Sequence, residues 1–164
     1  LNFVRRLPQD WKWALELRHP GWFDGSRAQQ ELDELLIERE ISRIVLDTRP
    51  LYAVPAASTA ATEEKSNKPD LPITLDAVGQ RPIIRVIGED SPQGTMKGLL
   101  KWVPKIKTWL DEGREPYVFV HQPENLDSPG LARALHTAVG MQHPALAPLP
   151  EAPAVEEPEQ TEMF

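Results

Sequence analysis

ISRIVLDT, residues 41–48, and RPIIRVIG, residues 81–88, are short runs rich in β-branched apolar side chains. A turn signal ends each run: Arg49-Pro50 follows the first, and Gly88 closes the second. Near-continuous apolar runs of this length are typical of strands that are buried on both faces. These two stretches therefore predict two buried strands, and they decide the fold class.

Two further strands flank this pair along the sequence. Trp13, Leu15 and Leu17 alternate with more polar residues, which is the period of a half-buried strand and predicts one over residues 12–18. The stretch PYVFVHQ predicts a fourth strand over residues 116–122. We therefore expect about four strands in all.

Helical periodicity separates these strands. An apolar stripe predicts an amphipathic helix over residues 26–40, and a longer stripe predicts a helix over 95–112. Pro104 within the longer stripe either introduces a kink or marks the residues before it as a false start of the helix. A cap at Ser128 starts a short final helix that ends before Gly140. Strands that alternate with helices predict an α/β fold, with parallel strands and helices packed outside them.

Two stretches are expected to lie outside the core. Residues 53–70, rich in Ala, Ser, Thr and charge, predict a long mobile connection that is either a lid over a binding site or an insertion without function. Residues 144–164 carry five Glu and no basic residue, which predicts a disordered Pro/Glu-rich tail. We therefore expect one folded domain over residues 1–143.

Composition excludes several classes of protein. The chain has no Cys, which rules out disulfide scaffolds, zinc–thiolate sites and Cys nucleophiles. No run of about 18 apolar residues occurs, so we expect a cytoplasmic protein that does not contact a membrane. Outside the tail, 20 acidic residues face 18 basic ones. This near-neutral charge balance gives no general basic surface for nucleic acid, and we expect no nucleic-acid partner.

Ionisable residues recur on the predicted strands, and most of them fall near the carboxyl ends. In parallel α/β folds these ends converge with the loops that bind ligands, so the side chains are expected to form a pocket. The residues concerned are Glu16, Arg18, Asp47, Arg85 and His121. Paired guanidinium groups favour a small anionic or carbonyl-bearing ligand, and the carboxylates and the imidazole are candidates for proton transfer.

The same side chains allow other interpretations. Glu16 with Arg85, and Asp47 with Arg18, could be ion pairs that fill the interior of a barrel. The carboxylates together with histidines could instead bind a divalent ion. Two arginines in the same space would repel a cation, so we predict no metal site and no cofactor. The chain also lacks a Gly-rich phosphate loop and a dinucleotide fingerprint.

Five stretches occur in an order that resembles one known family. They are ALELRHPGWF (14–23), RIVLDTR (43–49), PIIRVIG (82–88), WVPKIKTWLDEG (102–113) and YVFVHQPEN (117–125). The chain resembles the YecE-like proteins, also called the domain-of-unknown-function 72 family, over about residues 1–140, and Glu-x-Arg-His-Pro-x-Trp-Phe is the most specific block. The resemblance implies a (β/α)8 barrel longer than this chain, so that this chain would be the C-terminal half and a missing N-terminal barrel half is expected as its partner.

The resemblance also implies site residues but no established reaction. The positions that match the family are Glu16, Arg18, His19, Trp22, Asp47, Arg85, Gly88 and Asn125. His121 fits a variant that reads His-x-Pro-x-Asn, whereas Ile87 stands where the family often has a His, which argues against a fixed catalytic set of histidines.

The prediction is an uncharacterised YecE-like barrel protein, enzyme or enzyme-derived, that binds a small polar anion at the strand carboxyl ends. The alternatives are a non-catalytic binding or scaffold protein and a metal-dependent hydrolase or nuclease of barrel type. The catalytic candidates are Glu16, Asp47 and His121, and the ligand-binding candidates are Arg18, His19, Trp22, Arg85, Gly88 and Asn125.

Overall fold

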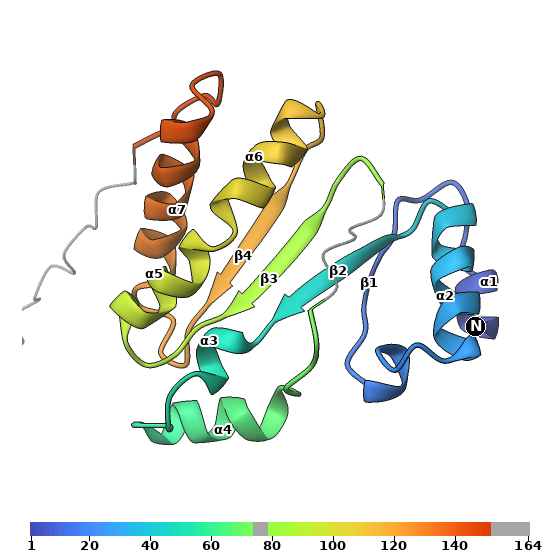
Figure 1. Ribbon diagram of the computed structural model, residues 1–164, viewed down its shortest axis with the longest axis horizontal. Coiled ribbons are helices and arrows are strands. Elements are labelled where there is room, and N and C mark those ends of the chain that lie inside the picture. Colours follow the sequence, from blue (N-terminus) through green and yellow to red (C-terminus); the bar gives the residue numbers. More distant parts are fainter. Residues whose placement is uncertain (74–78, 152–164) are drawn as a thin grey trace, which may run out of the picture.

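The computed structural model describes residues 1–73 and 79–151, and these residues form one parallel sheet with helices around it (Figure 1). The strands are β1 (Ala14–Glu16), β2 (Ser42–Asp47), β3 (Ile83–Ile87) and β4 (Tyr117–His121). They pair in sequence order, every pair is parallel, and the described residues provide no partner for the outer edges of β1 and β4. The predicted α/β class is confirmed, and the open sheet is consistent with part of a barrel.

The register of the strands determines which side chains share a face. Ile44 lies level with Glu16 on one side and with Ile83 on the other, and Arg85 lies level with Phe119. Because neighbours in register point to the same side, these residues share one face, which we call the open face. The opposite face carries the next residue of each strand and packs against helices.

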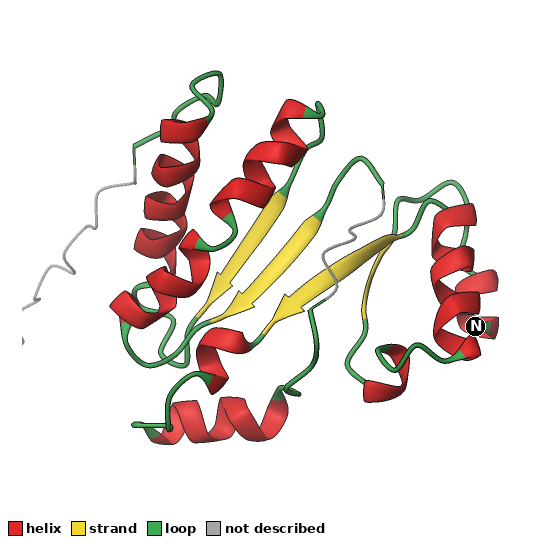
Figure 2. Ribbon diagram, in the orientation of Figure 1, coloured by secondary structure: helices red, strands yellow, loops and turns green. Residues whose placement is uncertain are grey.

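The helices that follow β3 and β4 form the main core. They are α5 (Pro92–Leu100), α6 (Val103–Asp111) and α7 (Ser128–Gln142), and Figure 2 shows them beside β3 and β4. Trp102 and Trp109 are each 1% exposed and pack with Ile84 and Val86 of β3. The helix-facing side of the sheet therefore supplies most of the buried apolar surface.

The apolar stripe over 95–112 is divided between two helices, so the prediction of one helix kinked at Pro104 is wrong, and a new helix begins at Val103. Pro104 has no N–H to donate, so it lies in the first turn of α6, where that donor has no intrahelical partner anyway. The first helix, α5, begins earlier than predicted, because the Ser91 hydroxyl caps it by accepting a hydrogen bond from the N–H of Gly94. The final helix, α7, is also longer than expected, with 15 residues.

The N-terminal part forms a second apolar cluster around β1. It contains α1 (Asn2–Arg5), the 3-10 helix η1 (Pro20–Trp22) and α2 (Arg27–Glu38). The predicted stripe of α2 is buried at Leu32, Leu35 and Leu36 and packs with Leu17. The helix predicted over 26–40 is therefore present, and Ser26 caps it.

Residues 53–70 are not the long mobile connection that was expected. This stretch contains α4 (Thr59–Asn67) and follows a short helix, α3 (Arg49–Tyr52). A Ser at position 58 caps α4, and Ala61 packs in the interior with 1% exposure. Both helices lie beyond the carboxyl ends of the strands (Figure 1). The crossover from β2 to β3 thus places a helix at the carboxyl ends of the strands.

The first part of the predicted tail packs against the protein. Leu146 contacts the main core, and the Pro150 carbonyl accepts a hydrogen bond of 2.7 Å from Arg133 Nη1. Residues 152–164 of the predicted tail lie outside the described residues. No described helix combines the length and apolar character needed to cross a membrane.

Candidate functional site

Glu16 joins two arginines on the open face of the sheet. Its Oε1 accepts hydrogen bonds from Arg18 Nε at 2.6 Å and from Arg85 Nη1 at 3.2 Å, and its Oε2 lies 3.2 Å from the same Arg85 nitrogen. β1 positions Glu16, the residues after β1 position Arg18, and β3 positions Arg85. The predicted ion pair between Glu16 and Arg85 is therefore present, and it includes a second guanidinium.

The charges of this cluster do not cancel. One carboxylate faces two guanidinium groups, which leaves a net charge of +1 in this cluster. The Glu16 side chain is only 14% exposed, whereas those of Arg85 and Arg18 are 29% and 47% exposed. The cations are thus accessible from solvent, while the carboxylate that fixes them is mostly covered.

A second ionic cluster lies where β4 ends. His121 Nε2 is 3.3 Å from Glu64 Oε2, and the same carboxylate oxygen is 3.0 Å from Lys68 Nζ. Burial alone would raise the pKa of the Glu64 carboxyl, but Lys68 and His121 together outweigh burial and lower this pKa below its ordinary value. Glu64 is therefore ionised at neutral pH and holds the Lys68 ammonium and the His121 imidazole near the carboxyl ends of the strands.

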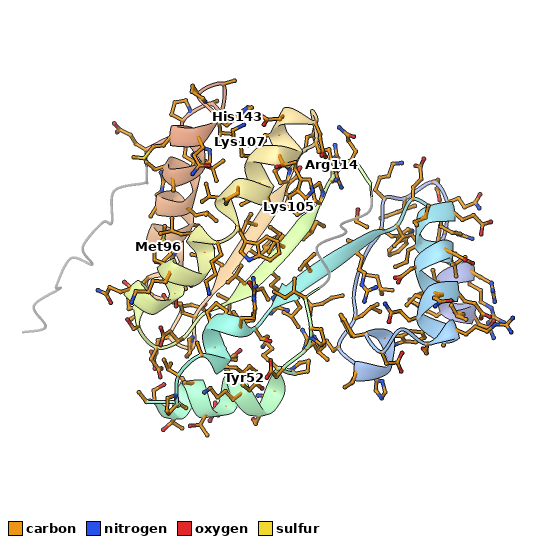
Figure 3. All side chains as sticks on the ribbon, viewed as in Figure 1. Tyr52, Met96, Lys105, Lys107, Arg114 and His143 are labelled. Atoms are coloured by element: carbon orange, nitrogen blue, oxygen red, sulfur yellow. The ribbon has the colours of Figure 1, made fainter. Side chains whose placement is uncertain are left out.

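Residues that follow or end three different strands hold α4, the helix that carries Glu64. Asp90, after β3, accepts hydrogen bonds from the Ala57 N–H and the Ser58 hydroxyl at the start of α4. Tyr52, after β2, donates to the backbone carbonyls of Lys65 and Lys68 at its end. Figure 3 shows Tyr52 between α3 and α4. Together with the contact to His121 at the end of β4, these bonds fix α4 across the strand ends.

Sequence reasoning missed Glu64 because residues 53–70 were interpreted as a loop. A local signal was present: Ser58 is an N-cap residue, and Glu64 and Lys68 stand four residues apart, which is the spacing of an ion pair on one helix. A helix over residues 59–67 with Lys68 as its C-cap brings the two side chains together at one side of the helix. That side is the one turned towards His121.

Asp47 does not join this site, so the expected convergence of five side chains is wrong. It shares the helix-facing side of β2 with Val45 and is 0% exposed. Its carboxylate accepts a hydrogen bond of 2.7 Å from Trp102 Nε1 and two of 2.9 Å from Arg49. The alternative pair of Asp47 with Arg18 is absent for the same reason: the two residues lie on opposite faces of the sheet.

Four other predicted ligand-binding residues make local structural contacts. The His19 ring caps η1 by accepting from the Gly21 N–H at 3.1 Å, and the Trp22 carbonyl accepts from a buried arginine, Arg43, at 2.9 Å. The Asn125 side chain accepts hydrogen bonds from the Gln122 N–H and the Ser128 hydroxyl, both 3.2 Å long.

Gly88, the fourth of these residues, lies where β3 passes close to α5. A Cβ at this position would lie 2.3 Å from Thr95 Oγ1, so only glycine fits. Behind it, Thr95 bonds to the backbone of Glu89, and Gln122 donates to Thr95 Oγ1 at 3.2 Å.

Residues 1–73 and 79–151 contain no group of three or more His, Asp or Glu side chains placed to hold a metal ion. The set considered from the sequence is divided in space, because Asp47 is on the helix-facing side and His19 caps η1. The side chains that remain together are those of Glu16, Arg18 and Arg85 and, at the end of the neighbouring strand, the group formed by His121 and α4.

Comparison with known proteins places this arrangement in a family. The model of a family described as "Protein of unknown function DUF72" matches residues 1–157. The chain belongs to the DUF72 family. Two curated relatives are the UPF0759 protein YecE of Escherichia coli K12 and that of Escherichia coli O157:H7, each 28% identical over 152 residues.

The match covers most of this chain but only part of each relative. It includes 93% of this chain but only 56% of each YecE protein. This DUF72 chain therefore spans a little over half the length of these relatives. No solved structure matches it.

Lowering the pH is expected to release α4 before the sheet unfolds. Because the pKa of Glu64 is lower in the folded protein than in the unfolded chain, its stabilising contribution is complete above the unfolded pKa. The contribution is lost as the pH falls through the folded pKa. NMR shifts of the α4 amides, followed from neutral to acid pH, should move before those of β3.

Glu64→Gln is the control for this titration. The amide keeps the shape of the side chain but does not ionise in this range, so the early step at α4 should disappear. An early step that persists unchanged in Glu64→Gln would assign the step to another acid, such as Asp90, whose pKa is lowered by its hydrogen bond from Ser58 at the start of α4.

Proposed function

We propose that this protein binds a small polar anion on the open face of its sheet, between Arg85 and Arg18. The observation that carries the proposal is the shared carboxylate: Glu16 fixes two partly exposed guanidinium groups and leaves one positive charge uncompensated. A fixed cation pair at the carboxyl-end half of a parallel sheet is a suitable place for an anionic ligand.

The two guanidinium groups have donors to spare. Arg85 uses only Nη1 for Glu16, and Arg18 uses only Nε. Within the described part of the chain, Arg85 Nε and Nη2 and both terminal nitrogens of Arg18 have no hydrogen-bond partner. These planar donor groups match the geometry of a carboxylate or a phosphate, which accepts two parallel hydrogen bonds.

Proton transfer in this proposal belongs to His121 rather than to Glu16. Two guanidinium groups occupy the Glu16 carboxylate, which therefore serves to hold them in place. His121 lies on the same face as Arg85, on the next strand and two positions further along the register. Strand spacing and rise put their Cα atoms about 8 Å apart. A ligand held by Arg85 thus extends towards an imidazole that Glu64 orients.

We infer that a further barrel half, of the kind that the unmatched length of the longer relatives could form, covers the open face. Tyr117 and Phe119 on this face are 46% and 57% exposed, although both are large aromatic side chains on a strand. Apolar surface of this kind is usually covered. The match accounts for 56% of each relative, and the remaining length is enough for further strands and helices.

Titration of the chain with phosphorylated and carboxylated metabolites tests the anion site. At least one class should raise the midpoint of thermal unfolding and shift the NMR signals of β1 and β3. Arg85→Met should weaken binding about 10- to 100-fold, because it removes charged hydrogen bonds worth about 1.5–3 kcal/mol.

Arg81→Met is the matched control for this measurement. Arg81 precedes β3, and its partner on the surface is Glu115 at 2.9 Å, so it makes no contact with Glu16. Its loss should leave ligand affinity unchanged. If no anion stabilises the protein, or if Arg85→Met and Arg81→Met bind alike, the assignment of Arg85 to a binding site is wrong.

A further inference from the structure

A basic groove lies on the helix side of the molecule, away from the open face. Two adjoining cavities of about 260 and 380 Å³ share Arg49 and Lys101 as lining residues. Lys97 lines one cavity and Lys105 the other. We define the basic groove by these four cations, which come from α3, α5, α6 and the turn between α5 and α6.

The groove is positively charged although the protein is not. Four cations line it, and two carboxylates, Asp47 and Glu89, lie among the same lining residues. This leaves a local charge of +2 on a chain with a net charge of −7. The Asp47 carboxylate is fully buried, and Arg49 and the Trp102 indole satisfy it, so it does not compete for an incoming ligand.

Two of the four cations are held in place by aromatic rings. The Arg49 guanidinium carbon lies 5.8 Å from the ring centroid of Trp102, and the Lys105 ammonium lies 5.4 Å from that of Trp109. Both rings are buried. Cation–π contacts therefore fix these two charges above the core, which lowers the entropic cost of ordering their side chains when a ligand binds.

The lysines of the groove have no competing partners. Among the residues that the structure describes, Lys97, Lys101 and Lys105 form no ion pair. Lys107 differs: it contacts Asp111 at 2.5 Å. Figure 3 shows Lys107 on the side of α6 towards His143, away from Lys105. Unpaired positive charge on this part of the surface is thus concentrated in the groove.

The donor set fits phosphate groups better than a single carboxylate. Arg49 already uses Nε and Nη2 on Asp47, so it cannot grip a carboxylate with its full donor fork. What remains is one guanidinium nitrogen and three ammonium groups, which act as point charges suited to a multivalent anion.

The spacing of the lysines indicates a chain of charges. Lys97, Lys101 and Lys105 follow one another at four-residue intervals, and the backbone stays in the right-handed helical region at Lys101 and Trp102 between the two helices. Each interval corresponds to about 6 Å along a helix axis. A row of ammonium groups over about 12 Å matches a linear ligand with several negative groups.

We propose that the basic groove binds the oligophosphate part of a small ligand. The ligand lies along α5 and the start of α6, with its charges towards the three lysines and Arg49. This site is distinct from the open face, because Arg85 points to the other side of the sheet.

Titration of the chain with sodium tripolyphosphate, followed by NMR, tests the proposal. Shifts should map to residues 94–105 and to Arg49, and affinity should fall as salt is added, since the contacts are ionic. The double variant Lys97→Gln/Lys101→Gln should bind at least about tenfold more weakly. ATP tested in parallel distinguishes the source: equal affinity indicates the phosphates alone, and tighter binding indicates a nucleotide.

The matched control is Lys12→Gln/Lys107→Gln, which removes the same charge outside the groove. It should keep wild-type affinity at the groove, read from the shifts of residues 94–105, as should Arg85→Met. The proposal is overturned if tripolyphosphate shifts no groove signal, if the control loses as much affinity as the test variant, or if Arg85→Met abolishes binding. It is also overturned if a single-stranded oligonucleotide binds the groove more tightly than tripolyphosphate, because the ligand would then be a nucleic acid.

Discussion

Replacing Trp102 by alanine is expected to lower the free energy of unfolding by about 3–5 kcal/mol. The side chain is 1% exposed, packs in the main core, and donates Nε1–H to Asp47 Oδ2 at 2.7 Å. The substitution leaves a cavity and also removes a partner from a fully buried carboxylate. Urea denaturation followed by circular dichroism measures the loss.

Trp102→Phe separates the two contributions. The phenyl ring keeps most of the apolar contact but cannot donate to Asp47, so the expected loss is about 1.5–3 kcal/mol, as for a hydrogen bond to a charged group. Leu100→Ala, at a 46% exposed position next to the same helix junction, should change stability far less. Wild-type stability in Trp102→Phe would mean that the indole does not hold Asp47.

Gly88→Ala is expected to cost about 1–3 kcal/mol of stability, because a methyl group here overpacks the contact between β3 and α5. The added Cβ would lie 2.3 Å from Thr95 Oγ1 and 2.4 Å from Thr95 Cγ2. The Thr95 side chain is fully buried and cannot move aside without breaking its bonds to Glu89 and Gln122. Chemical denaturation gives the change directly.

Two comparisons show whether Gly88 has a structural or a ligand-binding role. Gly130→Ala, where an added Cβ meets open space in α7, should leave stability unchanged or raise it by about 0.5–1 kcal/mol. Adding Thr95→Ala to Gly88→Ala should restore part of the lost packing. A Gly88→Ala protein with normal stability but weakened anion binding would instead support the ligand-binding role implied by family resemblance.

Local periodicity was enough to predict the strands and most helices. The apolar runs around Val45 and Ile84 and the alternation around Leu15 each mark a strand that the structure contains. What periodicity could not resolve is where a stripe is interrupted: the apolar positions on either side of Pro104 continue in phase, although the helix restarts there. Helix capping by Ser58 went unrecognised because the residues around α4 are mostly small and polar and give no stripe.

The site was only partly predictable because the sequence does not show which residues of neighbouring strands lie level with one another and face the same side of the sheet. Glu16 and Arg85 each interrupt an apolar strand face, so their meeting could be inferred. On β2, Val45 and Leu46 are both buried, so the pattern of that strand does not reveal which side Asp47 faces. Only the register, with Glu16 level with Ile44, shows that Asp47 lies on the helix-covered side.

The bonds around α4 have a mechanical consequence. Tyr52, Asp90 and His121 follow or end three different strands, and each of them contacts α4 or the residues that directly precede it. The end of α3, the loop after β3 and the end of β4 are thereby linked to one another through α4. Detachment of α4 would break all of these links at once, so we expect the strand ends to become exposed in one cooperative step rather than by separate loop movements.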